Sequence, residues 1–221
     1  CGVPSPSTLT NAYVALFEAA GGVVRQADVS GLSRDGDQWC IQLGGDKMHS
    51  DHVVVAAGPW SSEVAGWLGY KIPLAWERGY HLHLEPGDGP QLGRAICDMD
   101  GGFAIVPTLH GVRITSGVEI AERDAPKNVA QIMGSVASAR DAHDMKGVID
   151  DEPWMGRRPT LVDSLPMIGA APRHQGLWFN FGHQHLGLSM APGSGLAIAA
   201  MIDGQEPPFD PTPFRPTRFS I

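Results

Sequence analysis

Hydrophobic residues recur along this chain with two different periods, and these periods predict its secondary structure. Apolar residues at helical spacing run from a predicted N-cap at Ser7 to about Ala20, where Gly21-Gly22 follows. From Tyr80 to Leu84, apolar side chains alternate with histidines, which predicts a half-buried strand. The continuous apolar run Val53–Ala57 predicts a strand that is covered on both faces.

The remaining pattern consists of short strands, tight turns and a few helices. Further strands are predicted at 39–43, 48–55, 103–106, 112–116 and 177–181, and further helices at 61–68, 128–140 and 191–202. The 28 glycines and 18 prolines agree with many tight turns and exclude a helical bundle. The predicted fold class is therefore α/β (α+β), with a strand-rich segment, 71–155, inserted between two α/β pieces, 1–70 and 156–221.

Composition narrows the classes of partner. The net charge of −8 argues against nucleic acid or an anionic membrane as the main partner, because both need a basic surface. The sequence shows no signal-peptide pattern and no apolar run that we expect to span a bilayer. Cys1, Cys40 and Cys97 are odd in number and widely spaced, which favours a reducing compartment. We therefore expect a cytoplasmic protein, with attachment to the surface of the inner membrane left open.

Two adjacent arginines are the first candidates for a binding site. Arg157 and Arg158 lie in apolar sequence, upstream of the glycine- and histidine-rich stretch Gly182–Pro192. A guanidinium group donates two parallel hydrogen bonds to a carboxylate, and glycines allow the backbone to approach a ligand closely. The pattern therefore indicates a site for a small carboxylic acid. The alternative is a surface pair that solvates a loop.

The histidines and one glycine pair suggest other chemistry, which the sequence supports less well. His81-Leu-His83 and His183-Gln-His185 have the spacing of paired metal ligands on a strand, but no spaced carboxylate completes either pair. Gly193-Ser-Gly195 resembles a dinucleotide-binding fingerprint, yet Ile198 replaces its third glycine. No metal site is predicted, and a metal hydrolase remains a third alternative.

Four stretches in order resemble the FAD-dependent D-amino acid oxidase/dehydrogenase family, which includes glycine and sarcosine oxidases. The stretches are Val53–Ser61, Arg78-Gly-Tyr80, Gly156–Gly169 with its Gly-Arg-Arg-Pro, and Gly182–Pro192 with its Gly-His and Gly-Leu-Ser-Met-Ala-Pro. The resemblance implies part of an FAD-binding domain in segments 1–70 and 156–221, and a substrate-binding domain of antiparallel or mixed sheet in 71–155. It also implies FAD as the cofactor and a small carboxylate-bearing amine as the substrate. The implied reaction is hydride transfer from the substrate α-carbon to the flavin, followed by hydrolysis of the imine.

The resemblance also implies residue roles. Arg158 corresponds to the arginine of the Gly-x-Arg-Pro pattern that binds the substrate carboxylate. The residues implied at the cofactor are Val29, Ala57, Gly58, Trp60, Gly182, His183, Gly187, Leu188 and Ser189. No catalytic residue is assigned, because the flavin does the redox chemistry.

The chain departs from the family in two ways. The Gly-x-Gly-x-x-Gly unit that holds the ADP moiety is missing, so the chain resembles a C-terminal portion completed by a second chain or a missing half. In addition, Phe103-Ala104 stands where some members have a substrate-binding tyrosine. Arg157, Tyr80 and His185 are the predicted substitutes for that hydroxyl. The alternative function is a non-catalytic subunit that binds a carboxylate or a partner.

Overall fold

The chain folds as two compact units, and the computed structural model describes residues 5–221, so Cys1 lies outside the described part. Unit 1 consists of the chain up to Val24 together with Glu77–Arg157, and unit 2 of Arg25–Trp76 and Arg158–Ile221. This division differs from the predicted segments 1–70, 71–155 and 156–221 mainly in grouping the N-terminal helix with unit 1. The roles of these segments as flavin and substrate domains stay a prediction. The mixture of helices and sheets confirms the α/β class.

Unit 2 contains two three-stranded sheets. One is an antiparallel sheet of β1 (Val29–Asp35), β2 (Gln38–Leu43) and β3 (Asp46–Ser50). The other has the order β11 (Met167–Ala170), β12 (Leu177–Phe181) and β4 (Val53–Val55), in which β12 is antiparallel to β11 and parallel to β4. Trp39, Phe179 and Phe181 are fully buried in the core of this unit.

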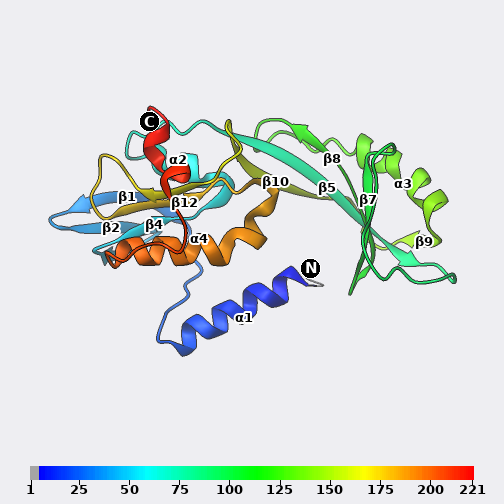
Figure 1. Cartoon of the computed structure of the whole chain (residues 1–221), viewed down its shortest axis with the longest axis horizontal. Helices are drawn as coiled ribbons and strands as arrows, with labels where there is room; N and C mark the ends of the chain where they lie inside the picture. The colour runs from blue at the N-terminus through cyan, green and yellow to red at the C-terminus, as the bar shows by residue number, and fades with distance from the viewer. Residues whose placement is uncertain (1–4) are drawn as a thin grey trace. The chain divides into compact units, whose positions relative to one another are not determined.

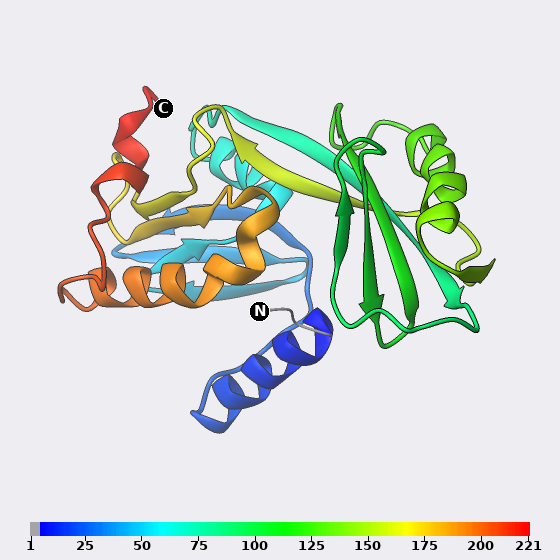
Figure 2. The ribbon, with the colours of Figure 1, turned by 45° about the vertical axis from the view of Figure 1, so that its right-hand side comes forward.

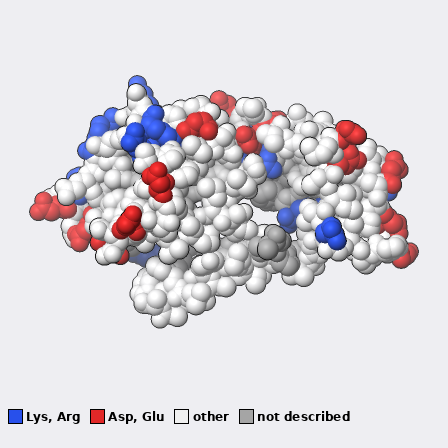
Figure 3. Space-filling view, viewed as in Figure 1, with Lys and Arg blue, Asp and Glu red and all other residues white. Residues whose placement is uncertain are grey.

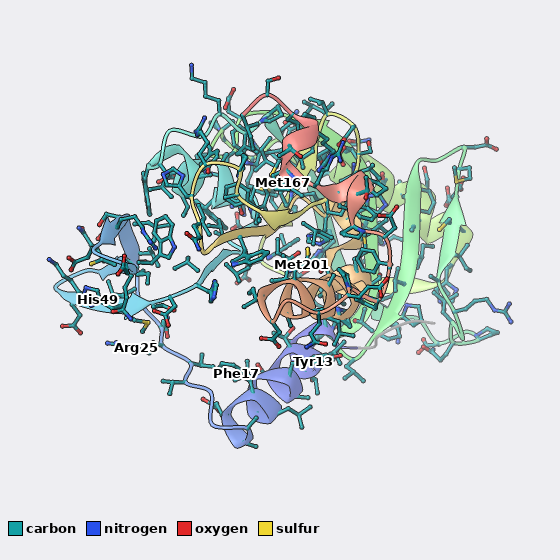
Figure 4. All side chains as sticks on the ribbon, turned by 60° about the vertical axis from the view of Figure 1, so that its left-hand side comes forward. Tyr13, Phe17, Arg25, His49, Met167 and Met201 are labelled. Atoms are coloured by element: carbon teal, nitrogen blue, oxygen red, sulfur yellow. The ribbon has the colours of Figure 1, made fainter. Side chains whose placement is uncertain are left out.

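The long helix α4 (Gly187–Ile202) packs on β11 and β12 (Figure 1). Ile168, Ala197 and Ile198 form the buried centre of this contact. Figure 4 shows Met201 on α4 and Met167 on β11 in this unit. Within residues 5–221, one segment is long and apolar enough to cross a membrane: Gln184–Ile202, with a mean hydropathy of 1.3. We had expected no such run. In this structure the helix covers one face of a sheet.

Unit 1 is built on a six-stranded sheet with one covering helix. Its strands are β5 (Leu74–Pro86), β6 (Ile96–Asp98), β7 (Phe103–Thr108), β8 (Gly111–Ile120), β9 (Met145–Val148) and β10 (Trp154–Leu161). The first three residues of β5 and the second half of β10, from Arg158 on, belong to unit 2. The order is β10-β5-β8-β7-β6, with β9 also paired to β5. Helix α3 (Ala130–Ala142) packs on β7 and β8 through Ile132, Val136 and Ala139 (Figure 2). The alternation predicted for β5 is confirmed, because Tyr80, Leu82 and Leu84 all join this core.

Helix α1 (Pro6–Ala19) has no buried residue. It begins earlier than predicted, because Ser5 rather than Ser7 is its N-cap: the Ser5 hydroxyl accepts from the Thr8 amide, and Pro6 occupies the first turn. Glu18 is its one Lys, Arg, Asp or Glu, so its surface is almost entirely uncharged (Figure 3). Tyr13 and Phe17, four residues apart, form an exposed apolar stripe on it (Figure 4).

Three sequence-based expectations are wrong for physical reasons. The strand β4 is not covered on both faces, because Val55 on one face is buried while Val54 on the other is 38% exposed. The helix α4 begins at Gly187, so Gly193-Ser-Gly195 lies inside the helix instead of opening it. His83 was expected to face solvent, because it lies on the polar side of the predicted strand, but it is only 8% exposed, because its ring is hydrogen-bonded to Asp150.

The remaining turns connect these elements. Helix α2 (Ser61–Gly66) follows a 3-10 turn, η1 (Gly58–Trp60), and a second 3-10 turn, η2 (Gln184–Leu186), precedes α4. The chain ends with η3 (Thr212–Phe214) and η4 (Pro216–Arg218), over which Lys and Arg side chains gather (Figure 3). Cys40 and Cys97 are free thiols, so no disulfide joins the described cysteines.

Candidate functional site

The candidate site lies in unit 2, at the edge of the sheet β11-β12-β4 where the strands β12 and β4 reach their carboxyl ends. Strands β12 and β4 are parallel, with Phe179 opposite Val55, so both end at the same edge. The turn Ala57–Trp60 follows β4 there, and the turn that begins at Gly182 follows β12. Ligands of open α/β sheets bind outside the carboxyl ends of parallel strands. This topology therefore brings together two stretches that are more than a hundred residues apart in sequence.

The backbone of both turns adopts conformations that favour glycine. Gly58 has φ +52°, and a Cβ atom placed on it would meet nothing within 4 Å. Gly182 has φ +83°, and a Cβ there would lie 2.9 Å from the Leu161 Cδ1 atom. Gly58 therefore leaves open space above the chain, whereas Gly182 is required by the close packing of β12 against β10.

The N-terminus of α4 lies at the same edge. Gly187, Leu188 and Ser189 form its first turn, and no side chain caps them. The first amides of a helix have no intrahelical partner and carry the positive end of the helix dipole. This end of α4 is therefore suited to an anionic or electron-rich ligand group.

Four buried polar atoms in unit 2 have no hydrogen-bond partner among residues 5–221. They are Ser61 Oγ, Thr160 Oγ1, Asn180 Oδ1 and His183 Nε2. Thr160 and His183 are opposed in an antiparallel bridge, so two of these atoms belong to facing residues. Burial lowers the pKa of His183 below its usual value, which keeps its imidazole neutral near pH 7. Unpaired buried polar atoms cost free energy, so they indicate a place for a polar ligand.

Arg157 and Arg158 are neighbours on β10, so their side chains point to opposite faces of the strand. The Arg157 guanidinium donates to the Arg123 carbonyl at 2.6 Å and pairs with Asp124 at 3.6 Å. Arg158 has no hydrogen bond or ion pair to any residue in the described part of the chain. It lies two residues before Thr160 and hence on the same side of β10, about 7 Å away along the strand.

Arg157 and Tyr80 are therefore poor substrate contacts, contrary to the prediction. Arg157 is occupied by the loop at 123–124. The Tyr80 hydroxyl donates to Glu119 Oε2 at 2.6 Å and accepts from Arg78 Nη2 at 2.9 Å and from the Asn128 amide at 3.0 Å. A phenol has one proton and two lone pairs, so this hydroxyl has no capacity left for a ligand.

The other predicted residues belong to unit 2. His185 and Leu188 are exposed around the start of α4, and Trp60 is exposed at the end of the β4 turn. Val29 is exposed at the start of β1, and its implied place at the cofactor stays a prediction. Among residues 5–221, no three His, Cys, Asp or Glu side chains lie close enough together to hold a metal ion.

Sequence reasoning missed Thr160, Ser61 and Asn180. Thr160 lies two residues after Arg158, and this spacing, which puts both side chains on the same side of a strand, was the signal available. Ser61 was included only as the end of a family-like stretch, and Asn180 only as part of a strand. Burial without a partner is a tertiary property, so the sequence carries no mark of it.

The carboxyl ends of two parallel strands, with their glycine turns and an uncapped helix N-terminus, suit an anionic cofactor in an α/β protein. An unpaired arginine suits a carboxylate. Comparison with known proteins shows the family to which the chain belongs. The family model described as "FAD dependent oxidoreductase" (DAO) matches residues 1–201, and the chain belongs to this family.

Curated relatives and solved structures agree with this membership. The chain is 31% identical to a D-amino-acid oxidase of Bradyrhizobium diazoefficiens over 218 residues, and 32% identical to a glycine oxidase of Pseudomonas aeruginosa over 200 residues. These alignments cover 94% and 86% of the chain but only 51% and 52% of the relatives. The chain thus spans about half the length of the curated relatives that it matches.

The fold agrees with two solved structures. It superposes on glycine oxidase from Geobacillus kaustophilus with a TM-score of 0.80 at 23% identity, covering 91% of this chain and 55% of that one. It superposes on L-proline dehydrogenase from P. horikoshii with a TM-score of 0.82 at 18% identity, covering 96% and 59%. These likenesses confirm the predicted fold class.

FAD is the cofactor of this family, and the residues of unit 2 fit it. The open space above Gly58 and the uncapped first turn of α4 suit a flat, electron-rich ring. The Ser61 and Asn180 oxygens are buried and lack a hydrogen-bond partner among residues 5–221. All nine residues predicted at the cofactor belong to unit 2.

Proposed function

We propose that the intact protein containing this chain oxidises the C–N bond of a small amino acid or secondary amine with FAD. The observation that carries this proposal is the unpaired Arg158 guanidinium, on the same side of β10 as Thr160 and its bridge partner His183. A guanidinium fork matches a carboxylate, while a hydroxyl and a neutral imidazole add further hydrogen bonds. The names of the relatives, D-amino-acid oxidase and glycine oxidase, support an amino acid as the substrate class.

In this proposal each group of the chain has a separate task. Arg158 binds the substrate carboxylate in two parallel hydrogen bonds, and Thr160 and His183 orient it. The α4 amides at Gly187–Ser189 stabilise negative charge that develops on a ligand beside them. FAD, when bound, accepts the hydride that leaves the substrate, so the protein supplies binding, orientation and electrostatics.

We also propose that FAD binding requires residues outside this chain. Strand β4 is the edge of its sheet, with Val54 exposed, and the chain spans about half the length of its relatives. A further parallel strand beside β4 would pair its free backbone groups and cover Val54. Such a strand would belong to a missing half or a second chain. If neither exists, the alternative of a non-catalytic binding subunit applies.

The substitution Arg158→Gln in the intact, flavin-loaded protein tests the proposed function. Loss of a charged, bidentate hydrogen bond raises KM for the amino acid substrate about tenfold or more, while visible absorbance shows that flavin remains bound. Arg157→Gln is the matched control: it sits on the same strand with its side chain on the other face, and its KM should change less than about twofold. Equal effects of the two variants, or an unchanged KM in Arg158→Gln, contradict the assignment.

A further inference from the structure

A polar hollow in unit 2 lies at the opposite end of the strands from the candidate cofactor site. Its volume is about 350 Å³, which is enough for a small molecule. The parallel strands β4 and β12 begin beside it, whereas the candidate cofactor site follows their carboxyl ends. The proposed function therefore does not use this hollow. It is lined by Arg34, Asp37, Asp51, His52, Gln175 and Gly176.

The turns that form the hollow are packed closely against one another. Gly176 has φ +74°, and a Cβ atom placed on it would lie 2.5 Å from the Asp51 carbonyl oxygen. The Gly176 carbonyl accepts from the Val53 amide at 2.8 Å, and the Gln175 carbonyl accepts from the buried Trp39 indole at 3.2 Å. The backbone around the hollow is therefore held in place before a ligand arrives.

The guanidinium of Arg34 is a free hydrogen-bond donor on one wall. Its Cζ atom lies 5.1 Å from the centroid of the Trp39 ring, so this cation–π contact restricts where the group can lie. None of its nitrogen atoms has a hydrogen bond or an ion pair within residues 5–221. The planar fork therefore has all its donors left for a carboxylate.

Two carboxylates line the same hollow without touching this cation. Asp37 has no hydrogen bond or ion pair to any residue in the described part of the chain. Asp51 Oδ1 accepts from Gln38 Nε2 at 3.0 Å, which leaves Oδ2 without a partner there. Neither carboxylate forms an ion pair with Arg34. The hollow thus presents both signs of charge to its contents.

We propose that this hollow binds a small α-amino acid as its zwitterion. The Arg34 fork holds the carboxylate, and Asp37 and Asp51 hold the ammonium group. One α-carbon joins the two charged groups of such a ligand, so it satisfies both signs at once, which a simple anion or a simple cation does not. The site does not depend on the proposed oxidation.

The test uses the full chain, labelled with ¹⁵N, and glycine as the probe at neutral pH and constant ionic strength. The Trp39 and Trp178 indole signals are the reporters, because their N–H groups donate to the Gln175 carbonyl and to His52 Nδ1. We expect glycine to shift both signals with one millimolar affinity. Acetate and methylammonium carry one charge each, so both should bind at least about tenfold more weakly.

Variants test the two signs of charge separately. Arg34→Gln and Asp37→Asn should each weaken the glycine affinity about tenfold or more. Arg34→Lys, which keeps the charge but loses the fork, should also weaken it. The matched controls are Arg25→Gln and Asp46→Asn, which break an exposed ion pair at the other end of the sheet β1-β2-β3. Each control should change the affinity less than about twofold.

Arg158→Gln separates this site from the proposed substrate site, because it should leave the glycine affinity at both indoles within about twofold. The proposal is overturned if roughly 100 mM glycine leaves both indole signals unmoved. It is also overturned if acetate or methylammonium binds as tightly as glycine, or if Arg25→Gln weakens binding as much as Arg34→Gln. Loss of both shifts in Arg158→Gln alone would assign them to the substrate site and overturn the proposal as well.

Discussion

The change Tyr80→Phe distinguishes a structural from a substrate-binding role for a residue that the sequence placed at the substrate. Arg78 is fully buried, and its Nε atom lies 3.2 Å from Glu119 Oε2 in an ion pair that lacks good hydrogen-bond alignment. The Tyr80 hydroxyl connects the same two residues and also accepts the Asn128 amide. Removing it breaks three hydrogen bonds, two of them to charged groups.

The expected cost follows from what the partners retain. Arg78 still donates to the Pro126 carbonyl at 2.7 Å and to the Ala125 carbonyl at 2.9 Å, so its charge is not left bare. Charged hydrogen bonds contribute about 1.5–3 kcal/mol each and a neutral one about 1 kcal/mol. Because the partners keep these other bonds, we expect unit 1 to lose about 2–4 kcal/mol of unfolding free energy.

Native-state hydrogen exchange of the slowest amides in β5 and β8 measures this loss, because they open only when unit 1 unfolds. Tyr13→Phe is the control, since its ring is exposed on α1 and its effect should stay below about 0.5 kcal/mol. In the intact protein Tyr80→Phe should leave KM unchanged. A loss of stability below about 0.5 kcal/mol, together with a raised KM, would refute the structural role and restore the substrate contact.

Two further predictions concern acid stability and the turn after β12. Burial and the nearby Arg113 lower the pKa of His81 from 6.5 to about 4, so the unfolded chain takes up this proton first as the pH falls. Unfolding free energy should therefore decrease from pH 6.5 to about 4, and His81→Asn should reduce that decrease by about 1–2 kcal/mol in urea titrations, allowing for partial exposure. Gly182→Ala should cost about 2–4 kcal/mol through positive φ and contact with Leu161, against about 1 kcal/mol for Gly58→Ala in open space, measured by urea midpoints. Equal costs for the two alanines would contradict the packing argument.

Much of the local structure was predictable, because side-chain period and turn residues are local properties. The alternation at Tyr80, Leu82 and Leu84, the strands β7 and β8 and the strand β12 were all confirmed. Boundaries were less certain. Ser5 and Ser7 are both good caps, and only the hydrogen bond to Thr8 distinguishes them. The start of α4 was placed late because its glycines and Pro192 are weak helix formers, and packing on the sheet overrides that preference.

By itself the sequence determined the α/β class and the family resemblance, because these depend on residue types in a fixed order, and it predicted Arg158 as the residue that binds the substrate carboxylate. Only the tertiary structure decided which polar groups remain free. Arg157 and Arg158 look alike in sequence, but strand alternation turns one to the 123–124 loop and leaves the other unpaired. The Tyr80 hydroxyl bonds to Arg78 and to two residues about 40 to 50 positions away, and Thr160 meets His183 only across a bridge. Hydrogen-bond satisfaction depends on such distant partners, so it cannot be read from the order of residues alone.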